Sequence, residues 1–394
     1  MKPVLIFGAS ARAAAQSAIR AGMRPICSDL FADLDLREMA EVLPAVRYPH
    51  DLPQIAERVP TGPWMYTGAL ENYPEIISAV SSQHRLWGNP VEVVDRVRDP
   101  FLVYALLHNA GLPAVDVRRQ SKPPPADGSW MIKPIRSAGG RGIRVWNEAA
   151  AGAGALDEPH YFQQKLDGTS ISALFLATAL RSRLVGITRQ FVGTKMLHAP
   201  RFGYCGSIGP LDLPTQIVRK IKRMGQELTD ACRLRGLFGI DLVCDGKSAR
   251  LTEVNPRYTA SVEVLENALR LPMLGWHGRT CEAFADPQAA SRLDDQLSSL
   301  CEQKQRDRFN RTAGKAILYA SRNLDIPQFD GSAIPPISGL WPHLADIPSP
   351  GSLILAGRPI CTILAEGSCR RKCLKQLVET IRMVRTYIST HSYS

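Results

Sequence analysis

The chain has 394 residues, too many for one compact core, so two to four subdomains are expected. Its hydrophobic fraction of 45% and charged fraction of 22% are those of an ordinary globular protein. No apolar run approaches the roughly 20 residues that span a bilayer. The formal net charge of +11 comes from basic residues spread along the chain, without the interleaved aromatic residues that stack on bases. We therefore expect neither a nucleic-acid nor a membrane partner.

Nine cysteines, an odd number, are scattered along the sequence. This scatter favours reduced thiols over a disulfide framework. The first apolar run, residues 4–7, is too short for a secretory signal and predicts a strand instead. A cytoplasmic location is the resulting expectation.

Residues 1–98 alternate between strand and helix patterns. A short apolar strand leads through a tight turn into an Ala-rich helix, and a second strand follows at 24–28. This βαβ opening predicts a Rossmann-like, doubly wound domain. The turn has Gly8, Ser10 and Ala13 where the dinucleotide fingerprint has three glycines. A dinucleotide site and a plain strand-to-helix turn both stay open.

The next part of the chain contains a glycine-rich segment between two strands. A helix is predicted over 100–110, followed by strands at 130–134, 143–146 and 161–166. Ser137, Gly139, Gly140 and Gly142 form the tip between the first two of these strands, and their backbone N–H groups could face phosphate oxygens. Lys133, just upstream, would supply a fixed positive charge for the same phosphates. An ordinary hairpin turn is the alternative.

A second pattern carries oxygen ligands. Residues 239–244 and 249–255 predict a hairpin across Asp245-Gly246. Glu253 and Asn255 are two apart on one strand and so face one side, and the pairing would bring Asp241 opposite that face. Magnesium prefers such oxygen ligands, usually one or two carboxylates together with substrate phosphates.

These motifs, in this order, make the chain resemble the ATP-grasp superfamily of the carboxylate–amine ligase type. The resemblance covers nearly the full length and implies mixed α/β and α+β architecture in four parts. We expect a Rossmann-like preATP-grasp domain, the small lobe of a two-lobed ATP-grasp fold with the glycine loop, its large lobe with the magnesium site, and a small C-terminal α+β block that ends in an amphipathic helix. The expected boundaries are 1–98, 99–168, 169–290 and 291–394.

The resemblance also implies roles for residues. Lys133 resembles the lysine on the nucleotide phosphates, and residues 137–142 resemble the mobile loop that covers them. Residues 163–166 resemble the hinge that bonds adenine through its backbone, and Asp167 is the candidate for the ribose hydroxyls. The hinge set is Gln163, Gln164, Lys165 and Leu166. Asp241, Glu253 and Asn255 resemble the ligands of Mg²⁺ (or Mn²⁺). Arg257 and Arg189 resemble arginines directed at the phosphoryl group or the substrate.

Two positions depart from the family pattern. Many members have a second nucleotide lysine where the helix after the first domain begins, and here that place reads Asp99-Pro100. The ribose residue is more often Glu than Asp. Both departures concern contacts to the nucleotide and leave the resemblance intact.

The resemblance implies an ATP-dependent, ADP-forming ligase that activates a carboxylate as an acyl-phosphate and joins it to an amine. Some similar members are linked to one-carbon cofactors (methanofuran and tetrahydromethanopterin), so a ligase step in making such a cofactor is a narrower expectation. A non-catalytic ATP-binding module and a dinucleotide-dependent oxidoreductase are the alternatives. Small-molecule substrates are the expected partners, and a homodimer is the prior for assembly.

Overall fold

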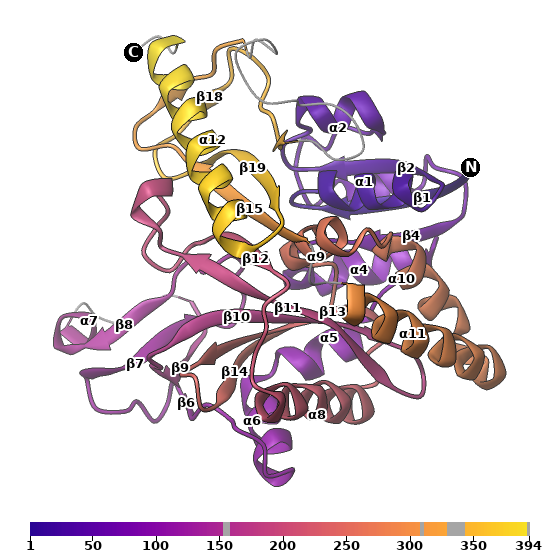
Figure 1. The fold of residues 1–394 in the computed structure, drawn as a ribbon, viewed down its shortest axis with the longest axis vertical. Coiled ribbons are helices and arrows are strands. Elements are labelled where there is room, and N and C mark those ends of the chain that lie inside the picture. The colour runs from indigo at the N-terminus through magenta and orange to yellow at the C-terminus, as the bar shows by residue number, and fades with distance from the viewer. Residues whose placement is uncertain (153–157, 308–310, 329–342, 392–394) are drawn as a thin grey trace.

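The computed structural model describes residues 1–152, 158–307, 311–328 and 343–391. Within these residues the strands form a five-stranded, an eight-stranded and a four-stranded sheet, together with one two-stranded ribbon. In the view of Figure 1 the N-terminal part is at upper right and the four-stranded sheet at lower left. No helix of the described part is both long and apolar enough to cross a lipid bilayer.

The N-terminal part is a parallel sheet in the order β3-β2-β1-β4-β5. Its elements are β1 (Lys2–Gly8), α1 (Arg12–Arg20), β2 (Met23–Asp29), α2 (Leu34–Met39), β3 (Glu41–Val42), α3 (Leu52–Ala56), β4 (Pro63–Tyr66), η1 (Leu70–Asn72), α4 (Pro74–Ser81) and β5 (Arg85–Leu86). The strand order reverses between β1 and β4, and in doubly wound sheets a crevice opens there at the carboxyl ends of the strands. Gly8 is needed at this edge, since a Cβ on it would lie 1.8 Å from Thr67 Oγ1. The predicted Rossmann-like part is confirmed.

Two helices connect this layer to an antiparallel sheet in the order β6-β9-β7-β8. These elements are α5 (Val91–Arg98), α6 (Pro100–Asn109), β6 (Val117–Arg119), β7 (Asp127–Pro134), β8 (Arg144–Asn147), α7 (Glu148–Gly152) and β9 (His160–Gln164). Asp99 caps α6, because its carboxylate accepts the N–H groups of Phe101 at 2.8 Å and Leu102 at 3.3 Å. The cap explains why the helix begins at the Asp-Pro pair.

The large sheet has the order β14-β13-β10-β11-β12-β15-β19-β17, and all its pairs are antiparallel. Its strands are β10 (Thr169–Ala177), β11 (Ser182–Val192), β12 (Tyr204–Gly209), β13 (Gly236–Cys244), β14 (Ala249–Asn255), β15 (Thr312–Tyr319), β17 (Leu344–Ala345) and β19 (Pro359–Gly367). The strands β15, β19 and β17 lie beyond the boundary expected at residue 290, yet they continue this sheet. The described C-terminal part therefore packs as an extension of the large lobe, and the boundary itself stays a prediction.

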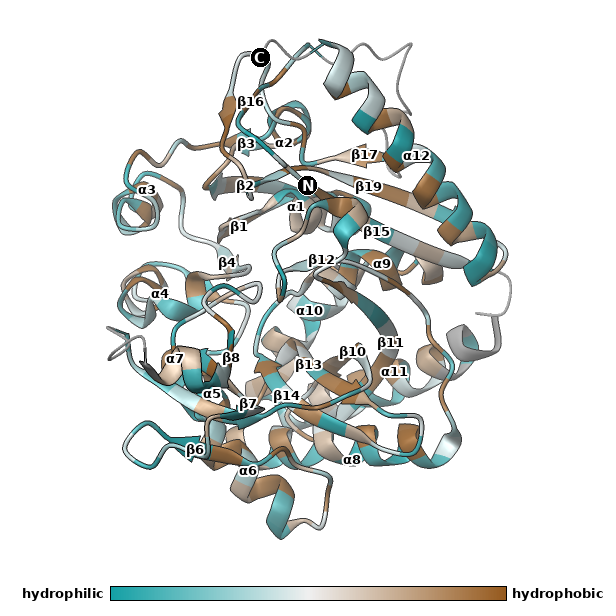
Figure 2. Ribbon diagram, turned by 90° about the vertical axis from the view of Figure 1, so that its left-hand side faces the viewer, coloured by the Kyte–Doolittle hydropathy of each residue, from teal (hydrophilic) through white to brown (hydrophobic). Residues whose placement is uncertain are grey.

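The remaining elements pack around this sheet. They are η2 (Lys195–Leu197), α8 (Thr215–Cys232), α9 (Ala260–Leu269), α10 (Met273–Glu282), η3 (Ala283–Ala285), α11 (Pro287–Asp307), β16 (Leu324–Asp325), β18 (Leu353–Ile354) and α12 (Arg370–His391). The predicted amphipathic C-terminal helix is present as α12, which shows apolar and polar patches along its length in Figure 2. Its buried residues, among them Leu377, Ile381, Val384 and Ile388, recur at helical spacing.

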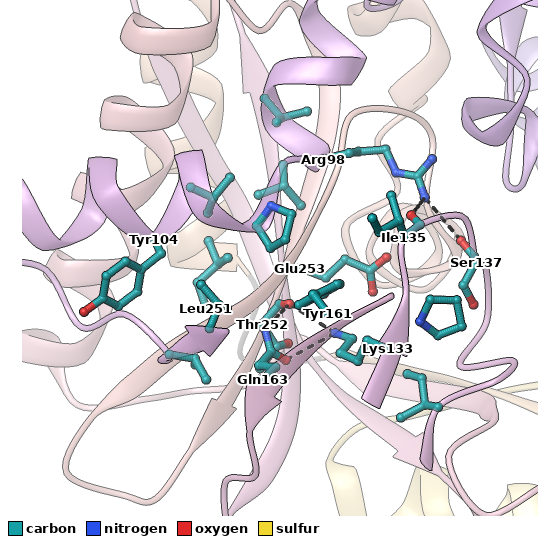
Figure 3. A pocket seen from close by; sticks show the side chains of 18 of the residues that line it. Arg98, Tyr104, Lys133, Ile135, Ser137, Tyr161, Gln163, Leu251, Thr252 and Glu253 are labelled. Carbon is teal, nitrogen blue, oxygen red and sulfur yellow. Dashed lines mark hydrogen bonds between the residues drawn. The ribbon is translucent and has the colours of Figure 1, made fainter. Parts of the chain in front are cut away.

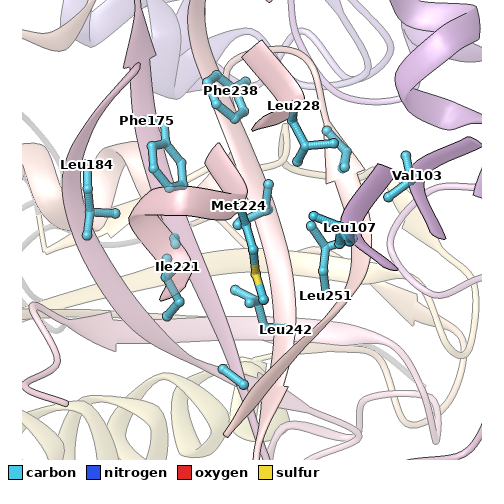
Figure 4. Close-up of a cluster of buried hydrophobic side chains, with 14 of the residues drawn as sticks. Val103, Leu107, Phe175, Leu184, Ile221, Met224, Leu228, Phe238, Leu242 and Leu251 are labelled. Atoms are coloured by element: carbon cyan, nitrogen blue, oxygen red, sulfur yellow. The ribbon is translucent and has the colours of Figure 1, made fainter. Parts of the chain in front are cut away.

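One hydrophobic core lies between α6, α8 and the strands β10 and β13 (Figure 4). Phe175 and Phe238 stack at its centre, with ring centroids 5.0 Å apart and planes inclined by 10°. Gly225 of α8 lets the helix approach, since a Cβ there would lie 2.3 Å from the Phe175 ring. This core fixes β13, and β13 carries one of the polar residues of the cleft described next.

Candidate active site

A cleft lies between the four-stranded sheet and one face of the large sheet. Strands β7 and β9 contribute one wall, and β10, β11, β13 and β14 contribute the other. The glycine-rich segment, residues 202–204 and the beginning of α9 also line it. A neighbouring pocket beside α6 shares Lys133, Gln163, Thr252 and Glu253 with the cleft (Figure 3).

A β-bulge in the hairpin shapes the centre of the cleft. Asp241 pairs with Glu253 and Leu242 pairs with Leu251, so Thr252 is an extra residue on β14. The carbonyl of Thr252 is thereby free of the ladder. It accepts hydrogen bonds from Lys133 Nζ at 3.3 Å and from Gln163 Nε2 at 3.1 Å. The bulge thus ties the two walls of the cleft together.

The three residues predicted to bind magnesium lie together on one face of the hairpin. Asn255 Nδ2 donates to Asp241 Oδ2 at 3.1 Å, and Gln190 Nε2 donates to Asp241 Oδ1 at 3.0 Å. Burial, and then the neighbouring charge of Glu253, raise the pKa of Asp241 to about 6. A divalent cation between these oxygens would favour the ionised carboxylate again.

The chemistry of this donor set fits one class of metal. It offers two carboxylates and one amide, all oxygen donors, which suits Mg²⁺ held jointly with substrate phosphates. In the described residues no group of three or more His, Cys, Asp or Glu side chains could hold a metal alone. The residues present therefore fit a cation that arrives with a phosphate-bearing substrate.

Lys133 lies in the same cleft, as predicted. Its ammonium group donates to Gln163 Oε1 at 3.2 Å and lies 5.9 Å from the centre of the Tyr161 ring (Figure 3). Burial lowers its pKa, but Tyr161, Glu253 and Asp241 outweigh burial, so the pKa is raised. Lys133 is therefore a fixed positive charge facing the acidic strand residues.

The glycine-rich tip adopts backbone conformations that favour glycine. Gly139, Gly140 and Gly142 have φ of +63°, +84° and +77°. A Cβ on Gly140 would lie 2.0 Å from the carbonyl oxygen of Phe202, and the Tyr204 N–H donates to the Gly139 carbonyl at 3.2 Å. Ser137 Oγ donates to the Arg141 carbonyl at 2.5 Å. The tip is thus held against residues 202–204 at the rim of the cleft.

The predicted hinge lines the cleft at residues 163–166. The N–H groups of Gln164 and Lys165 are already bound, to the carbonyls of Asp116 at 2.9 Å and Ser129 at 2.8 Å. Within the described chain the Leu166 N–H has no protein acceptor, so it is the hinge donor left for a ligand. Asp167 is exposed and does not line the cleft, so its proposed contact with a ribose has no support in the structure.

Arg189 also lies outside the cleft. Its side chain is exposed, whereas the adjacent Gln190 lines the cleft and binds Asp241. Successive side chains of a strand point to opposite faces of the sheet. The side chain of Gln190 points toward Asp241, so that of Arg189 points to the other face. The expected role of Arg189 in the cleft therefore has no support in the structure, and Gln190 is the residue of this pair that lines the cleft. The sequence alone could have predicted the alternation, but not which face of β11 would be turned inward.

Arg257, the other arginine predicted at the site, lines the cleft through a fixed guanidinium group. Its Nε donates to Glu71 Oε1 at 2.7 Å and its terminal nitrogens donate to Asn255 Oδ1 and to the Tyr258 carbonyl, each at 3.1 Å. Just beyond it, Thr259, Ala260 and Ser261 bring the N-terminus of α9 to the cleft. Arginine and helix N-terminus together favour an anion here.

Sequence reasoning missed Arg98. It is the last residue of α5, one position before the Asp-Pro pair that replaces the second nucleotide lysine, and it lines the smaller cavity with Lys133 and Glu253 (Figure 3). One terminal nitrogen donates to the Glu71 carbonyl at 2.8 Å. A basic residue adjacent to the expected lysine position was the available clue.

The dinucleotide alternative loses its anion site in the structure. At the N-terminus of α1, the Ala11 N–H donates to Asp29 Oδ2 at 3.0 Å, and the other oxygen of Asp29 accepts the N–H groups of Phe31 and Ala32. A pyrophosphate would need the position that this buried carboxylate occupies. Gly8 therefore belongs to a strand-to-helix turn capped by the protein itself.

Comparison with known proteins agrees with this geometry. The sequence model of the ATP-grasp domain matches residues 97–261. The large chain of carbamoyl phosphate synthase from Thermus thermophilus is 22% identical over 204 residues, which are 48% of this chain and 20% of that protein. This chain thus spans about a fifth of that relative, and a match to the same large chain from Clostridium acetobutylicum covers 6% of it.

Two solved structures resemble nearly the whole chain. The L-amino acid ligase from Bacillus licheniformis has a TM-score of 0.69 at 15% identity, over 96% of this chain and 98% of that one. The biotin carboxylase domain of 2-oxoglutarate carboxylase from Hydrogenobacter thermophilus, solved with MgADP and bicarbonate, has a TM-score of 0.69 at 13% identity, over 96% and 89%. Residues 97–261 thus match the ATP-grasp domain, and the chain as a whole has the fold of these ATP-grasp-like structures.

Proposed function

We propose that this protein is an ATP-dependent, ADP-forming ligase that activates a carboxylate as an acyl-phosphate and joins it to an amine. The observation that carries the proposal is the meeting of Lys133 with Asp241, Glu253 and Asn255 in one cleft between two sheets. Phosphoryl transfer needs positioning and charge neutralisation rather than a side-chain nucleophile, and this residue set supplies both. The similarity to structures that the preceding comparison names supports the same class.

The nucleotide has a consistent place in the cleft. The Leu166 N–H would bind the adenine edge, and the triphosphate would extend toward Lys133, the tip at 137–142 and Arg98. Asp241, Glu253 and Asn255 would hold Mg²⁺ or Mn²⁺ against the phosphate oxygens. When bound, the cation would offset the negative charge that these oxygens share with the two carboxylates.

The carboxylate substrate would lie at the start of α9. Two N–H groups of Arg257 remain after its three contacts within the protein, since a guanidinium has five donors. The first N–H groups of a helix have no partner inside the helix, and Thr259 Oγ1 is buried without a partner in the described residues. These donors suit a carboxylate and, later, the oxygens of its acyl-phosphate.

The reaction would proceed in two balanced steps. A carboxylate oxygen attacks the terminal phosphorus, the bond from that phosphorus to the bridging oxygen of ATP breaks, and ADP leaves with the electron pair. The amine nitrogen then attacks the acyl carbon. The new C–N bond replaces the C–O bond to phosphate, inorganic phosphate leaves, and the nitrogen loses a proton.

The deciding experiment measures ADP release with panels of carboxylates, including bicarbonate and amino acids, each tested with a panel of amines. A hit is repeated with an ¹⁸O-labelled carboxylate, and one labelled oxygen should appear in the inorganic phosphate. Glu253→Gln should lower turnover by about 100-fold or more while ATP binding stays measurable. ADP release that needs no carboxylate, or unlabelled phosphate, would contradict the ligase. ATP binding without any turnover would indicate the non-catalytic module.

Narrower proposals have less support. A step in making a one-carbon cofactor, methanofuran or tetrahydromethanopterin, rests on the sequence resemblance alone. A cytoplasmic location, small-molecule partners and assembly as a homodimer are likewise predictions, for which the panel assay and a measurement of mass in solution are the tests.

A further inference from the structure

Glu71, in the N-terminal layer, contacts Arg257, a residue that lines the cleft. It lies in η1, the turn that follows β4, and only 5% of the residue is exposed. Its Oε1 accepts the Arg257 Nε–H at 2.7 Å, a contact between residues 186 positions apart. Its Oε2 is buried and has no donor within the described residues. A buried carboxylate with one free oxygen is costly, which calls for a reason beyond the fold.

The contact determines how Arg257 can act. A guanidinium binds an anion best when its planar fork is held in one orientation. Asn255 Oδ1 and the Tyr258 carbonyl each accept one terminal N–H, but both acceptors lie within two residues of Arg257 in the sequence. Glu71, by contrast, belongs to a distant part of the chain and accepts the Nε–H of Arg257. It leaves the two remaining terminal N–H groups for a ligand in the cleft.

The turn itself is held independently of the Glu71 carboxylate. The Glu71 carbonyl accepts an N–H of Arg98 at 2.8 Å, and Asn72 Nδ2 lies 3.5 Å from the Ser137 carbonyl. The backbone N–H of Asn72 also donates to the Ala69 carbonyl at 3.1 Å. A substitution of the Glu71 side chain should therefore release Arg257 without dismantling the turn.

We propose that Glu71 is a positioning residue, which orients Arg257 so that its two free N–H groups face the oxygens of the activated carboxyl group. The nature of that ligand rests on the proposed function, whereas the orienting contact does not. A displacement of about 1 Å in a positioning group can cost about 100-fold in rate. Loss of Glu71 should thus lower kcat rather than the affinity for ATP.

The first test needs no substrate. Side-chain ¹⁵N NMR follows the Nε–H of Arg257, assigned by its disappearance in Arg257→Lys. In Glu71→Ala this proton should lose its protection from exchange with water, and Glu71→Gln should keep it, because an amide oxygen still accepts. Glu282→Ala is the matched control: Glu282 pairs with Arg85 at 2.7 Å on the surface, away from the cleft. Unchanged protection in Glu71→Ala would overturn the proposal.

The second test uses turnover with a carboxylate and amine pair found in the panel. Glu71→Ala should lower kcat by about 100-fold with KM for ATP within about twofold, and Glu71→Gln should restore most of the rate. Equal rates in Glu71→Ala and the native protein would also overturn the proposal. If Glu71→Ala does not fold, Glu71→Asp, which withdraws the carboxylate by one methylene, replaces it in both tests. If no carboxylate supports turnover, the ligase fails while the NMR result still decides the role of Glu71.

Discussion

Two clusters of charge among the described residues differ in burial and in the way they are paired. One is the cleft around Lys133, Asp241 and Glu253. The other is centred on Arg12, which is fully buried where α1, α9 and the C-terminal strands meet. Arg12 forms ion pairs with Glu263 and with Asp346, the latter at 2.9 Å, and Lys315 Nζ lies 2.7 Å from Glu263.

The pKa shifts separate the two clusters. Burial raises the pKa of Glu263, but Arg12 and Lys315 outweigh burial and lower it to about 2. The pKa of Asp346 is lowered for the same reason. In the cleft, by contrast, burial and Glu253 raise the pKa of Asp241 to about 6. Cations within the protein thus outweigh burial at Glu263 and Asp346, whereas Lys133 and Arg257 do not outweigh burial at Asp241.

The Arg12 cluster is not neutral at its edge. Burial raises the pKa of Asp33 to about 8 and that of Asp35 to about 6, with nearby carboxylates adding to the effect at Asp33. Asp33 is the N-cap residue of α2, and Asp35, in the same helix, lies 3.7 Å from Arg12 Nε. The comparison therefore teaches that burial raises the pKa of a carboxylate in either cluster unless nearby cations outweigh it, as they do at Glu263 and Asp346.

Breaking the Arg12 cluster should have the largest effect on stability. Arg12→Met removes the shared cation and leaves Asp346 and Asp35 buried beside each other. We expect the free energy of unfolding to fall by about 3–5 kcal/mol, because an unpaired buried charge is left behind. Urea denaturation measures the change. Arg24→Met is the control, since its ion pair with Glu41 is about half exposed and should contribute less than about 1 kcal/mol. Equal losses in both variants would contradict the distinction.

Removing the charge of Asp241 from the cleft should raise the free energy of unfolding, whereas removing Arg12 should lower it. The pKa of Asp241 is about 6 in the folded protein and about 3.9 when unfolded. Between these values the folded state binds more protons, so stability falls as pH rises from about 4 to about 6 and stays low above it. Asp241→Asn removes this cost and should be more stable than the native protein by about 1–3 kcal/mol at pH 7, with no difference near pH 4. Urea denaturation across this range is the measurement.

Two further measurements sharpen the same contrast. Mg²⁺ with ADP should stabilise the native protein at pH 7 and lose that effect in Asp241→Asn.

For Glu263 the sign reverses: its folded pKa of about 2 lies below the unfolded value of about 4.3, so its stabilisation is present above the unfolded pKa and disappears as pH falls toward 2. Glu263→Gln should therefore destabilise at pH 7, and a stabilised Glu263→Gln would contradict the assignment.

The sequence predicted the cleft better than the Arg12 cluster for a physical reason. Asp241, Glu253 and Asn255 lie on one hairpin, where alternation and a short turn determine their common face. Lys133 lies near the end of β7, the strand that leads directly into the glycine-rich tip. The Arg12 contacts instead join residues 251 and 334 positions apart, and no local pattern predicts such a meeting. The same is true of Glu71 and Arg257.

Local reasoning also failed where it needed the orientation of a whole strand or loop. The chain turns Asp167 outward after β9, and β11 places Arg189 on the face away from Asp241. Strands β10 to β12 are not among the elements predicted from the sequence. Where predicted polar residues lay on paired strands of known register, as in β13 and β14, their placement was right.

The smallest expected effect tests that orientation directly. Arg189→Ala should change turnover by less than about twofold, because its side chain is exposed outside the cleft. Gln190→Ala, one residue away, removes the hydrogen bond that holds Asp241 Oδ1 at 3.0 Å. A partner that orients a metal ligand typically contributes about 10–100-fold, so Gln190→Ala should weaken Mn²⁺ binding and turnover by about 10-fold. Electron paramagnetic resonance of Mn²⁺ in the presence of ADP measures the affinity in both variants. If Arg189→Ala proved the more damaging of the two, the inward face of β11 would have to be reassigned, and the earlier expectation for Arg189 would be restored.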